Sequence, residues 1–474
     1  MLFNTTTYLI FLPLVFACYW CMRSTKGQNW VVLLASMVFY GWWSLPFLGL
    51  MVATSLLNFI CVKRMEQTAW RKPWMATALV VNFGVLALFK YFNFFAENFA
   101  SLITLFGLKA DMPTINIILP VGISFYTFQL SAYVIDCYRE NLKPTASLLN
   151  FLSFIMFFPQ LVAGPIERGS KLLTQMEKQR SFSYPDGVGG LRLILLGLFK
   201  KMVIADNCAL SVDAIFAHPV HYGASTLVLG TVFFALQIYG DFSGYSDIAR
   251  GSAKLLGIQL SQNFRKPYLA TSIIDFWRRW HITLQTWLRD YIYIPLGGSR
   301  GSEGRTQLNV LIVFAVSGLW HGASWTFVLW GVYHALLFIP SRRMASRQKT
   351  GTDAPGRLPL RTCVSRLVTF MLVCFGWLIF RCESVSDIGD YMNAMCRFNG
   401  LWQIPAPPSA TLALVGLLAS ALLLICEYRL LHKEDVTEGF DALPTGIRRA
   451  LYVVIVLLIM VFGGDNSAFI YFQF

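Results

Sequence analysis

The sequence predicts an all-α, polytopic membrane protein. Hydrophobic residues make up 56% of its 474 residues and charged residues only 14%, a composition too apolar for a soluble fold. Apolar runs long enough to cross a hydrocarbon core of about 30 Å recur along the chain, separated by short clusters of Arg and Lys. The formal net charge of +14 therefore reflects membrane topology. We expect no nucleic-acid partner, because no soluble domain carries a basic face.

The first apolar run, residues 7–22, predicts a retained helix, since no basic residue precedes it and no small-residue cleavage site follows. Its N-terminus is expected outside the cytoplasm. Two further spans form a hairpin that turns at WWSLP, residues 42–46. Cys18 and Cys21 form a lone C-x-x-C motif without a second pair, so we expect no metal site.

Basic clusters set the orientation of the next elements, because Arg and Lys in short loops stay in the cytoplasm. Residues 148–165 have basic residues on both sides, which favours a re-entrant or interfacial segment over a crossing. Spans near 202–217 and 226–249 are expected to go out and return. Residues 251–306 are basic, aromatic and interrupted, as in a cytoplasmic or half-inserted module.

The last third of the chain predicts five more spans. Residues 308–338 are too long for one crossing, so we expect a hairpin broken near 322–324 and followed by a basic linker at 341–361. Spans near 363–380, 411–425 and 447–462 follow. The prediction is one domain, residues 1–474, with about twelve crossings, both termini extracytoplasmic, and an outer tail at 463–474 that reaches roughly 36 Å if extended.

Two of the six histidines are candidates for chemistry. His321 lies in SGLWHGASW inside an apolar hairpin, where an imidazole needs a partner or a function. It suits a general base for acyl transfer, and a histidine hydrogen-bonded between helices is the alternative. His281 lies in DFWRRWHITLQTW beside charged residues, where an interfacial structural role is also open. Solvated or structural roles are expected for the other four: His218, His221, His334 and His432.

The residues around His281 predict a binding site for the phosphates of a nucleotide-like donor. The candidates are Arg278, Arg279, Trp280 and Arg289. Guanidinium groups match phosphate geometry, although topology alone also explains a basic cytoplasmic cluster. In YGDFSGYSDIARG, Asp241 and Asp247 line a polar tunnel or pair with arginines across the bundle, and we favour pairing.

Several blocks together resemble one family: FFPQLVAGPIER, GDFSGYSDIARG, RRWHI and SGLWHGASW. In this order they are similar to the membrane-bound O-acyltransferases, in the bacterial branch that acetylates alginate and peptidoglycan. The resemblance implies a helix bundle around a central tunnel, which donor and acceptor enter from opposite sides to meet a central histidine. By motif, that histidine is His321. His281 matches a second polar position that orients the donor or stabilises the thioester oxygen.

The tail AFIYFQF also resembles a motif of this branch. Phe469, Tyr471 and Phe474 form F-x-Y-x-x-F, which is similar to a C-terminal acyl-relay motif. The resemblance implies that the Tyr471 hydroxyl accepts the acyl group once a base removes its proton, and that Phe469 and Phe474 dock the tail. The alternative is a tail that only packs on the bundle or in the interfacial aromatic belt.

These interpretations lead to an O-acetyltransferase of the bacterial cytoplasmic (inner) membrane that uses acetyl-CoA and holds no permanent cofactor. Acetyl passes through His321-activated Tyr471 to an extracytoplasmic SGNH/GDSL-type transferase and then to a polysaccharide, with peptidoglycan favoured over cellulose or alginate. One alternative is a D-alanyl transferase to teichoic acid. Another is a non-enzymatic polysaccharide or lipid transporter in which His321 couples protons.

Overall fold

The chain is helical throughout its described part. A computed structural model describes residues 1–107, 118–347, 360–400, 407–463 and 469–470, and every regular element in these ranges is a helix. Six of the described helical stretches are long and apolar enough to cross a membrane: Leu45–Gln67, Arg71–Leu105, Ala224–Leu255, Leu360–Arg381, Ala410–Arg429 and Thr445–Phe462. The all-α membrane fold is confirmed, and the count of about twelve crossings stays a prediction.

Two compact units make up the chain. The first unit comprises Met1–Leu191 and Ala249–Ser261, and the second comprises Arg192–Ile248 and Gln262–Phe474. We describe each unit by itself. The expected single domain over residues 1–474 stays a prediction.

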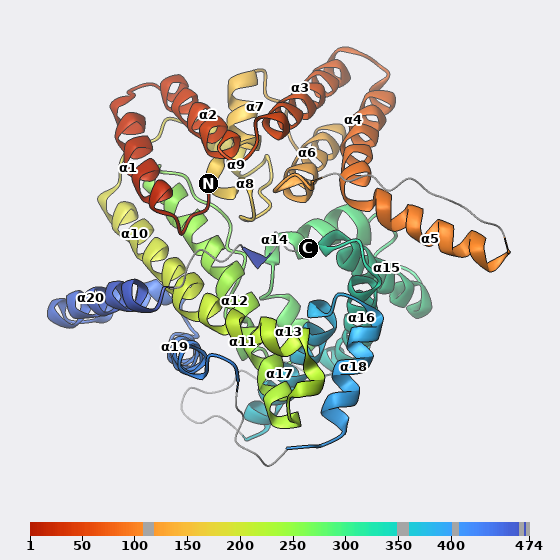
Figure 1. The fold of residues 1–474 in the computed structure, drawn as a ribbon. Coiled ribbons are helices and arrows are strands. Elements are labelled where there is room, and N and C mark those ends of the chain that lie inside the picture. The colour runs from red at the N-terminus through yellow and green to blue at the C-terminus, as the bar shows by residue number, and fades with distance from the viewer. Residues whose placement is uncertain (108–117, 348–359, 401–406, 464–468, 471–474) are drawn as a thin grey trace. The chain divides into compact units, whose positions relative to one another are not determined.

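The first unit begins with a series of apolar helices. They are α1 (Thr6–Cys21), α2 (Thr25–Gly41), α3 (Leu45–Gln67), α4 (Arg71–Leu86), η1 (Ala87–Tyr91), α5 (Phe92–Leu105) and α6 (Ile123–Tyr138). The turn between α2 and α3 lies at WWSLP, as predicted, and α3 is long and apolar enough to cross a membrane. Helices α3 and α4 lie side by side (Figure 1), joined by buried Asn58 and Asn82, whose amides donate to each other's Oδ1 at 2.7 and 3.0 Å. Such amide pairs hold membrane helices together.

The segment predicted to be re-entrant contains only short helices. Helix α7 (Leu148–Ile155) has 8 residues and α8 (Phe158–Leu161) has 4, and the side chains of residues 151–166 are buried. At 1.5 Å per residue, α7 covers about 12 Å, far less than a hydrocarbon core. The prediction that this segment is not a continuous crossing is confirmed. The short α9 (Leu172–Met176) follows.

The expected span near 202–217 begins earlier than predicted. Helix α10 (Tyr184–Leu198) continues through a π-helical segment, η2 (Phe199–Ala205), into α11 (Asp206–Ala217). Lys200 and Lys201 lie within this continuous stretch, and both are paired with carboxylates. After a short turn, η3 (Pro219–His221), helix α12 (Ala224–Leu255) extends over 32 residues, or about 48 Å.

The module at 251–306 is interrupted, as predicted. Its helices are short: η4 (Pro267–Leu269), α13 (Ile273–Trp277), α14 (Ile282–Leu288) and η5 (Arg289–Tyr293). The predicted hairpin then follows, because α15 (Glu303–His321) ends and α16 (Trp325–Arg347) begins at the expected break. The two helices approach closely at Gly318 and Gly331, where an added Cβ would lie 2.1 Å from the Phe327 carbonyl oxygen and 2.3 Å from that of Phe314.

The remaining helices belong to the second unit. They are α17 (Leu360–Arg381), α18 (Val385–Cys396), α19 (Ala410–Arg429), η6 (Val436–Ala442) and α20 (Thr445–Phe462). Helices α17, α19 and α20 confirm the last three predicted spans, whereas α18 was not predicted. Only 6% of the apolar window of α20 is buried, as expected for a helix that faces lipid.

Candidate active site

His321 lies at the C-terminal end of α15, in contact with several aromatic rings. Its side chain is buried. Ring centroids lie 5.0 Å away for Trp320, 5.2 Å for Trp330 and 5.3 Å for Phe380, each in an edge-to-face arrangement. Gly322 then takes the chain out of the helix, and an added Cβ there would overlap the Phe327 ring at 2.0 Å. The imidazole therefore lies where the hairpin breaks, in apolar surroundings.

His281 lies close to His321 although 40 positions separate them in the sequence. The two ring centroids are 6.4 Å apart, and Trp320 contacts both rings. His281 adopts the left-handed conformation, with φ of 47°, at the start of α14. This conformation costs most residues roughly 1–2 kcal/mol, so it requires support from its neighbours.

Asn263 supplies that support. Its Oδ1 lies 3.2 Å from His281 Nδ1 and accepts from the Thr283 hydroxyl at 3.0 Å, while its carbonyl accepts from the Ile282 amide at 2.9 Å. This arrangement favours the tautomer with the proton on Nδ1, which leaves the ring lone pair on Nε2. Burial lowers the pKa of His281 to about 3, so the ring is neutral at physiological pH.

The described part of the C-terminal tail also lies in the second unit. Phe469 is 2% exposed, and its ring contacts Tyr245 at 4.9 Å and Phe242 at 6.0 Å. Phe242 in turn contacts the His281 ring at 4.8 Å. Tyr471 and Phe474, the other two residues of the F-x-Y-x-x-F motif, lie outside the described residues.

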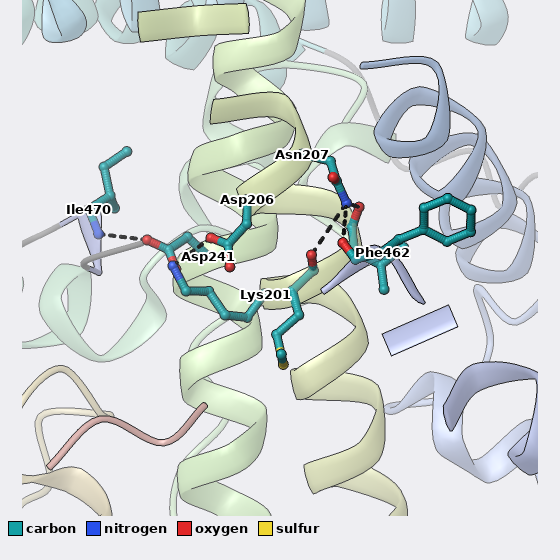
Figure 2. A network of polar contacts seen from close by, with 8 residues as sticks. Lys201, Asp206, Asn207, Asp241, Phe462 and Ile470 are labelled. Atoms are coloured by element: carbon teal, nitrogen blue, oxygen red, sulfur yellow. Dashed lines mark hydrogen bonds and ion pairs between the residues drawn. The ribbon is translucent and has the colours of Figure 1, made fainter. Parts of the chain in front are cut away.

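Asp241 and Asp247 are paired, as favoured, but with lysines rather than the expected arginines. Lys200 Nζ lies 2.7 Å from Asp247 Oδ2, and Lys201 Nζ lies 2.8 Å from Asp241 Oδ1. Figure 2 shows Lys201 beside Asp241, whose other oxygen accepts from the Ile470 amide at 2.6 Å. Neither lysine is among the residues predicted from the sequence. A pair of lysines inside an apolar run was the signal available, because intramembrane charges require partners.

Comparison with known proteins identifies the family of this chain. The sequence model described as MBOAT, membrane-bound O-acyltransferase family, matches residues 6–376. The chain belongs to this family. The expected family is thereby confirmed, and the protein is an acyltransferase.

Individual relatives of this acyltransferase are named for different polymers. The probable alginate O-acetylase AlgI of Pseudomonas aeruginosa is 37% identical over 441 residues, which cover 91% of this chain and 82% of the relative. The peptidoglycan O-acetyltransferase of Helicobacter pylori is 34% identical over 85% of this chain and 81% of its own. The teichoic acid D-alanyltransferase of Bacillus subtilis is more distant, at 28% over 56% of this chain and 70% of its own.

The predicted donor-binding residues of the acyltransferase differ in exposure and in their contacts. Arg278 is exposed. Arg279 lies 2.7 Å from Asp275, and Arg289 lies 2.7 Å from Asp290. Trp280 is 1% exposed and packs on other rings, including Phe264, Phe276 and Trp377. Trp280 is thus part of a buried aromatic cluster. These three arginines of the segment 251–306 are more exposed than Trp280.

His334 lies among aromatic rings. A solvated or structural role is the expectation for this residue, and it is fully buried in α16. Its ring lies 5.0 Å from Trp330, which also contacts His321, and 5.0 Å from Trp277. No hydrogen-bond partner for its ring nitrogens lies in the described residues. The available signal was its spacing of four from Trp330, which places both on one side of a helix. By contrast, His218, His221 and His432 are exposed.

Proposed function

We propose that this acyltransferase transfers acetyl from cytoplasmic acetyl-CoA, through Tyr471, for O-acetylation of a polysaccharide outside the cytoplasm. The relatives named for alginate and peptidoglycan acetylation support this substrate class. Alginate and peptidoglycan are both possible acceptors under this proposal, and peptidoglycan stays the favoured one. The shorter match to the D-alanyltransferase makes teichoic acid the second choice. Membership of the acyltransferase family argues against a transporter without chemistry.

One observation carries the mechanism: a buried pair of imidazoles, His321 and His281, surrounded by aromatic rings and linked through Phe242 to Phe469. In such apolar surroundings an imidazole keeps the lone pair that a general base needs. A phenol with an ordinary pKa of about 10 is a poor nucleophile until a base removes its proton. The proposed role of His321 is to take that proton.

The proposed reaction is a direct acyl transfer from the thioester to the phenol. His321 takes the proton of the Tyr471 hydroxyl while the phenolic oxygen forms a bond to the thioester carbonyl carbon. The carbon–sulfur bond breaks, and the thiolate of coenzyme A takes the proton from the imidazolium. His281 Nε2 is suited to orient the donor or the His321 ring. The product is an aryl ester, which a serine of an SGNH/GDSL-type partner then attacks, restoring Tyr471. The phosphates of the donor are assigned to Arg278, Arg279 and Arg289.

This sequence of steps implies a location. We place the acyltransferase in the bacterial inner membrane, with both termini outside the cytoplasm, so that the tail and the partner lie on the same side. Labelling of the tail in intact cells with a membrane-impermeant reagent tests this orientation, because only a tail on the outer face can react.

Mass spectrometry of the C-terminal peptide tests the function. Purified protein is incubated with isotopically labelled acetyl-CoA, and wild type is compared with His321→Gln, Tyr471→Phe and the exposed control His218→Gln. We expect label on Tyr471 in wild type and in the control only. If His321-dependent turnover of acetyl-CoA continues without label on Tyr471, the relay is wrong. Label only after addition of a D-alanyl carrier protein supports the teichoic acid alternative.

A further inference from the structure

The second unit contains a buried ionic group that the proposed chemistry does not use. Lys201 Nζ lies 2.8 Å from Asp206 Oδ1 and 2.8 Å from Asp241 Oδ1. The three side chains are between 3% and 9% exposed. Burying charges in apolar surroundings is costly, so such a group persists only where it is well paired. We call these three residues the Lys201 cluster.

The Lys201 cluster carries one lysine and two carboxylates, so by itself it has one excess negative charge. The lysine lies in the π-helical segment η2, and such segments are frequent at functional sites. A donor from elsewhere stabilises the excess charge. That donor is the amide of Ile470, which lies 2.6 Å from Asp241 Oδ2 (Figure 2). Hydrogen bonds to an ionised carboxylate are roughly twice as strong as neutral ones.

Neighbouring contacts place the described tail residues, Phe469 and Ile470, beside the same turn of α12. Phe469 packs against Phe242 and Tyr245, which follow Asp241 at positions i+1 and i+4 of that helix. Phe469 and Ile470 are both 2% exposed. At the other end of the tail, the Asn207 side chain donates to the carbonyl of Phe462 at 2.9 Å, which fixes the end of α20 (Figure 2).

We propose that Asp241, held in place by Lys201, is the docking residue for the C-terminal tail, and that this docking positions Tyr471 for acylation. The second half rests on the proposed function. Asp241 is a positioning residue here, because it contacts the tail backbone rather than the reacting atoms. Since consecutive Cα atoms are 3.8 Å apart, an anchored Ile470 restricts where Tyr471 can lie.

Hydrogen exchange of the tail, measured by mass spectrometry on the full-length protein in nanodiscs, tests the docking without reference to activity. Ile470→Pro removes the donor N–H and leaves the Lys201 cluster intact. Asp241→Asn leaves one acceptor oxygen where two are used. We expect tail peptides to exchange at least about tenfold faster in both variants, a loss of about 1.4 kcal/mol. Peptides of α15 and α16 should stay unchanged, which shows that the fold is kept.

Two matched controls accompany these variants. Ile470→Val keeps the amide, and Asp213→Asn changes an exposed aspartate that pairs with Arg381 at 2.9 Å. Neither should alter exchange in the tail. Unchanged exchange in both Ile470→Pro and Asp241→Asn overturns the docking, whatever happens to acetylation.

Labelled acetyl-CoA is then added to the same samples. Faster tail exchange together with loss of label on Tyr471 supports both halves of the proposal. Faster exchange with normal labelling overturns the positioning role and leaves the docking. Faster exchange in the variants, with no label on Tyr471 even in wild type, leaves the docking intact and shows that the relay in the proposed function is wrong.

Discussion

The histidine pair and the Lys201 cluster are two buried polar groups of the same unit that are accommodated in opposite ways. His281 is neutral, because burial among aromatic rings lowers its pKa to about 3. Lys201, by contrast, lies between two carboxylates, and the Ile470 amide donates to one of them. An imidazole that must accept a proton needs its lone pair, whereas a residue that must hold a chain segment benefits from full charge. The difference is what the roles proposed for the two groups, chemistry and recognition, require.

The largest expected effect is on catalysis at the histidine pair. His321→Gln should lower the rate of acetyl transfer by about 10²–10⁴-fold, because a general base contributes that much. Thermal unfolding should change little, since Gln is polar and of similar size. Single-turnover transfer of labelled acetyl measures the effect. A variant that keeps more than about a tenth of the wild-type rate contradicts the assignment of His321 as the base.

The Lys201 cluster should show the opposite pattern, with a large effect on stability. Lys201→Met leaves Asp206 and Asp241 buried without this cation, which should lower the free energy of unfolding by about 3–5 kcal/mol. Chemical unfolding in mixed micelles measures this loss. Lys254→Met is the matched control, because Lys254 lies 3.3 Å from Asp186 in a pair that is 33% and 42% exposed. Its loss should cost about 0–1 kcal/mol, and equal effects would contradict the prediction.

A change of pH should have an intermediate effect on the free energy of unfolding. Since the folded pKa of His281 is about 3 and its ordinary value is 6.5, the unfolded chain binds more protons between these values. The free energy of unfolding therefore falls as pH falls through 6.5. The contribution of His281 should make it about 2 kcal/mol lower at pH 5 than at pH 7. His281→Asn tolerates the left-handed backbone and should reduce this loss. Unfolding at both pH values gives the comparison, and equal pH dependence of wild type and variant would show that His281 does not cause it.

The smallest effect on stability is expected at the module surface. Arg279 and Asp275 form a partly exposed i, i+4 pair, so Arg279→Ala should change the free energy of unfolding by less than about 0.5 kcal/mol. If the guanidinium binds donor phosphates, KM for acetyl-CoA should rise at an unchanged kcat. An unchanged KM would remove Arg279 from the donor site, and Arg305→Ala serves as the control for general loss of positive charge.

Much of the helical framework could be predicted from local sequence. Hydropathy located α17, α19 and α20 closely, since crossing a hydrocarbon core requires a long apolar run. The break after His321 followed from a run too long for one helix. The continuous helix from Tyr184 to Ala217 could not be predicted in this way, because it depends on carboxylates of α12 that lie some 40 residues away in sequence.

The candidate site was predictable in its residues more than in its geometry. Motifs singled out His281 and His321, but their proximity depends on a left-handed turn supported by Asn263, which no periodicity encodes. The choice between a solvated and a structural His334 could not be made from sequence, because its contact with Trp277 joins residues far apart in the chain. The contact between Asp241 and Ile470 joins residues 229 positions apart, and nothing in either local sequence indicates it.

The close approach of α15 and α16 has a consequence for protein engineering. Replacing helical glycines with alanine is a common route to thermostability, worth about 0.4–1 kcal/mol where the site allows it. Gly84 in α4 has no atom within 4 Å of an added Cβ and is open to this change. At Gly318 and Gly331 the same replacement would drive the two helices apart beside His321. A stabilised version of this enzyme should therefore be sought by leaving the hairpin untouched and by screening glycines elsewhere.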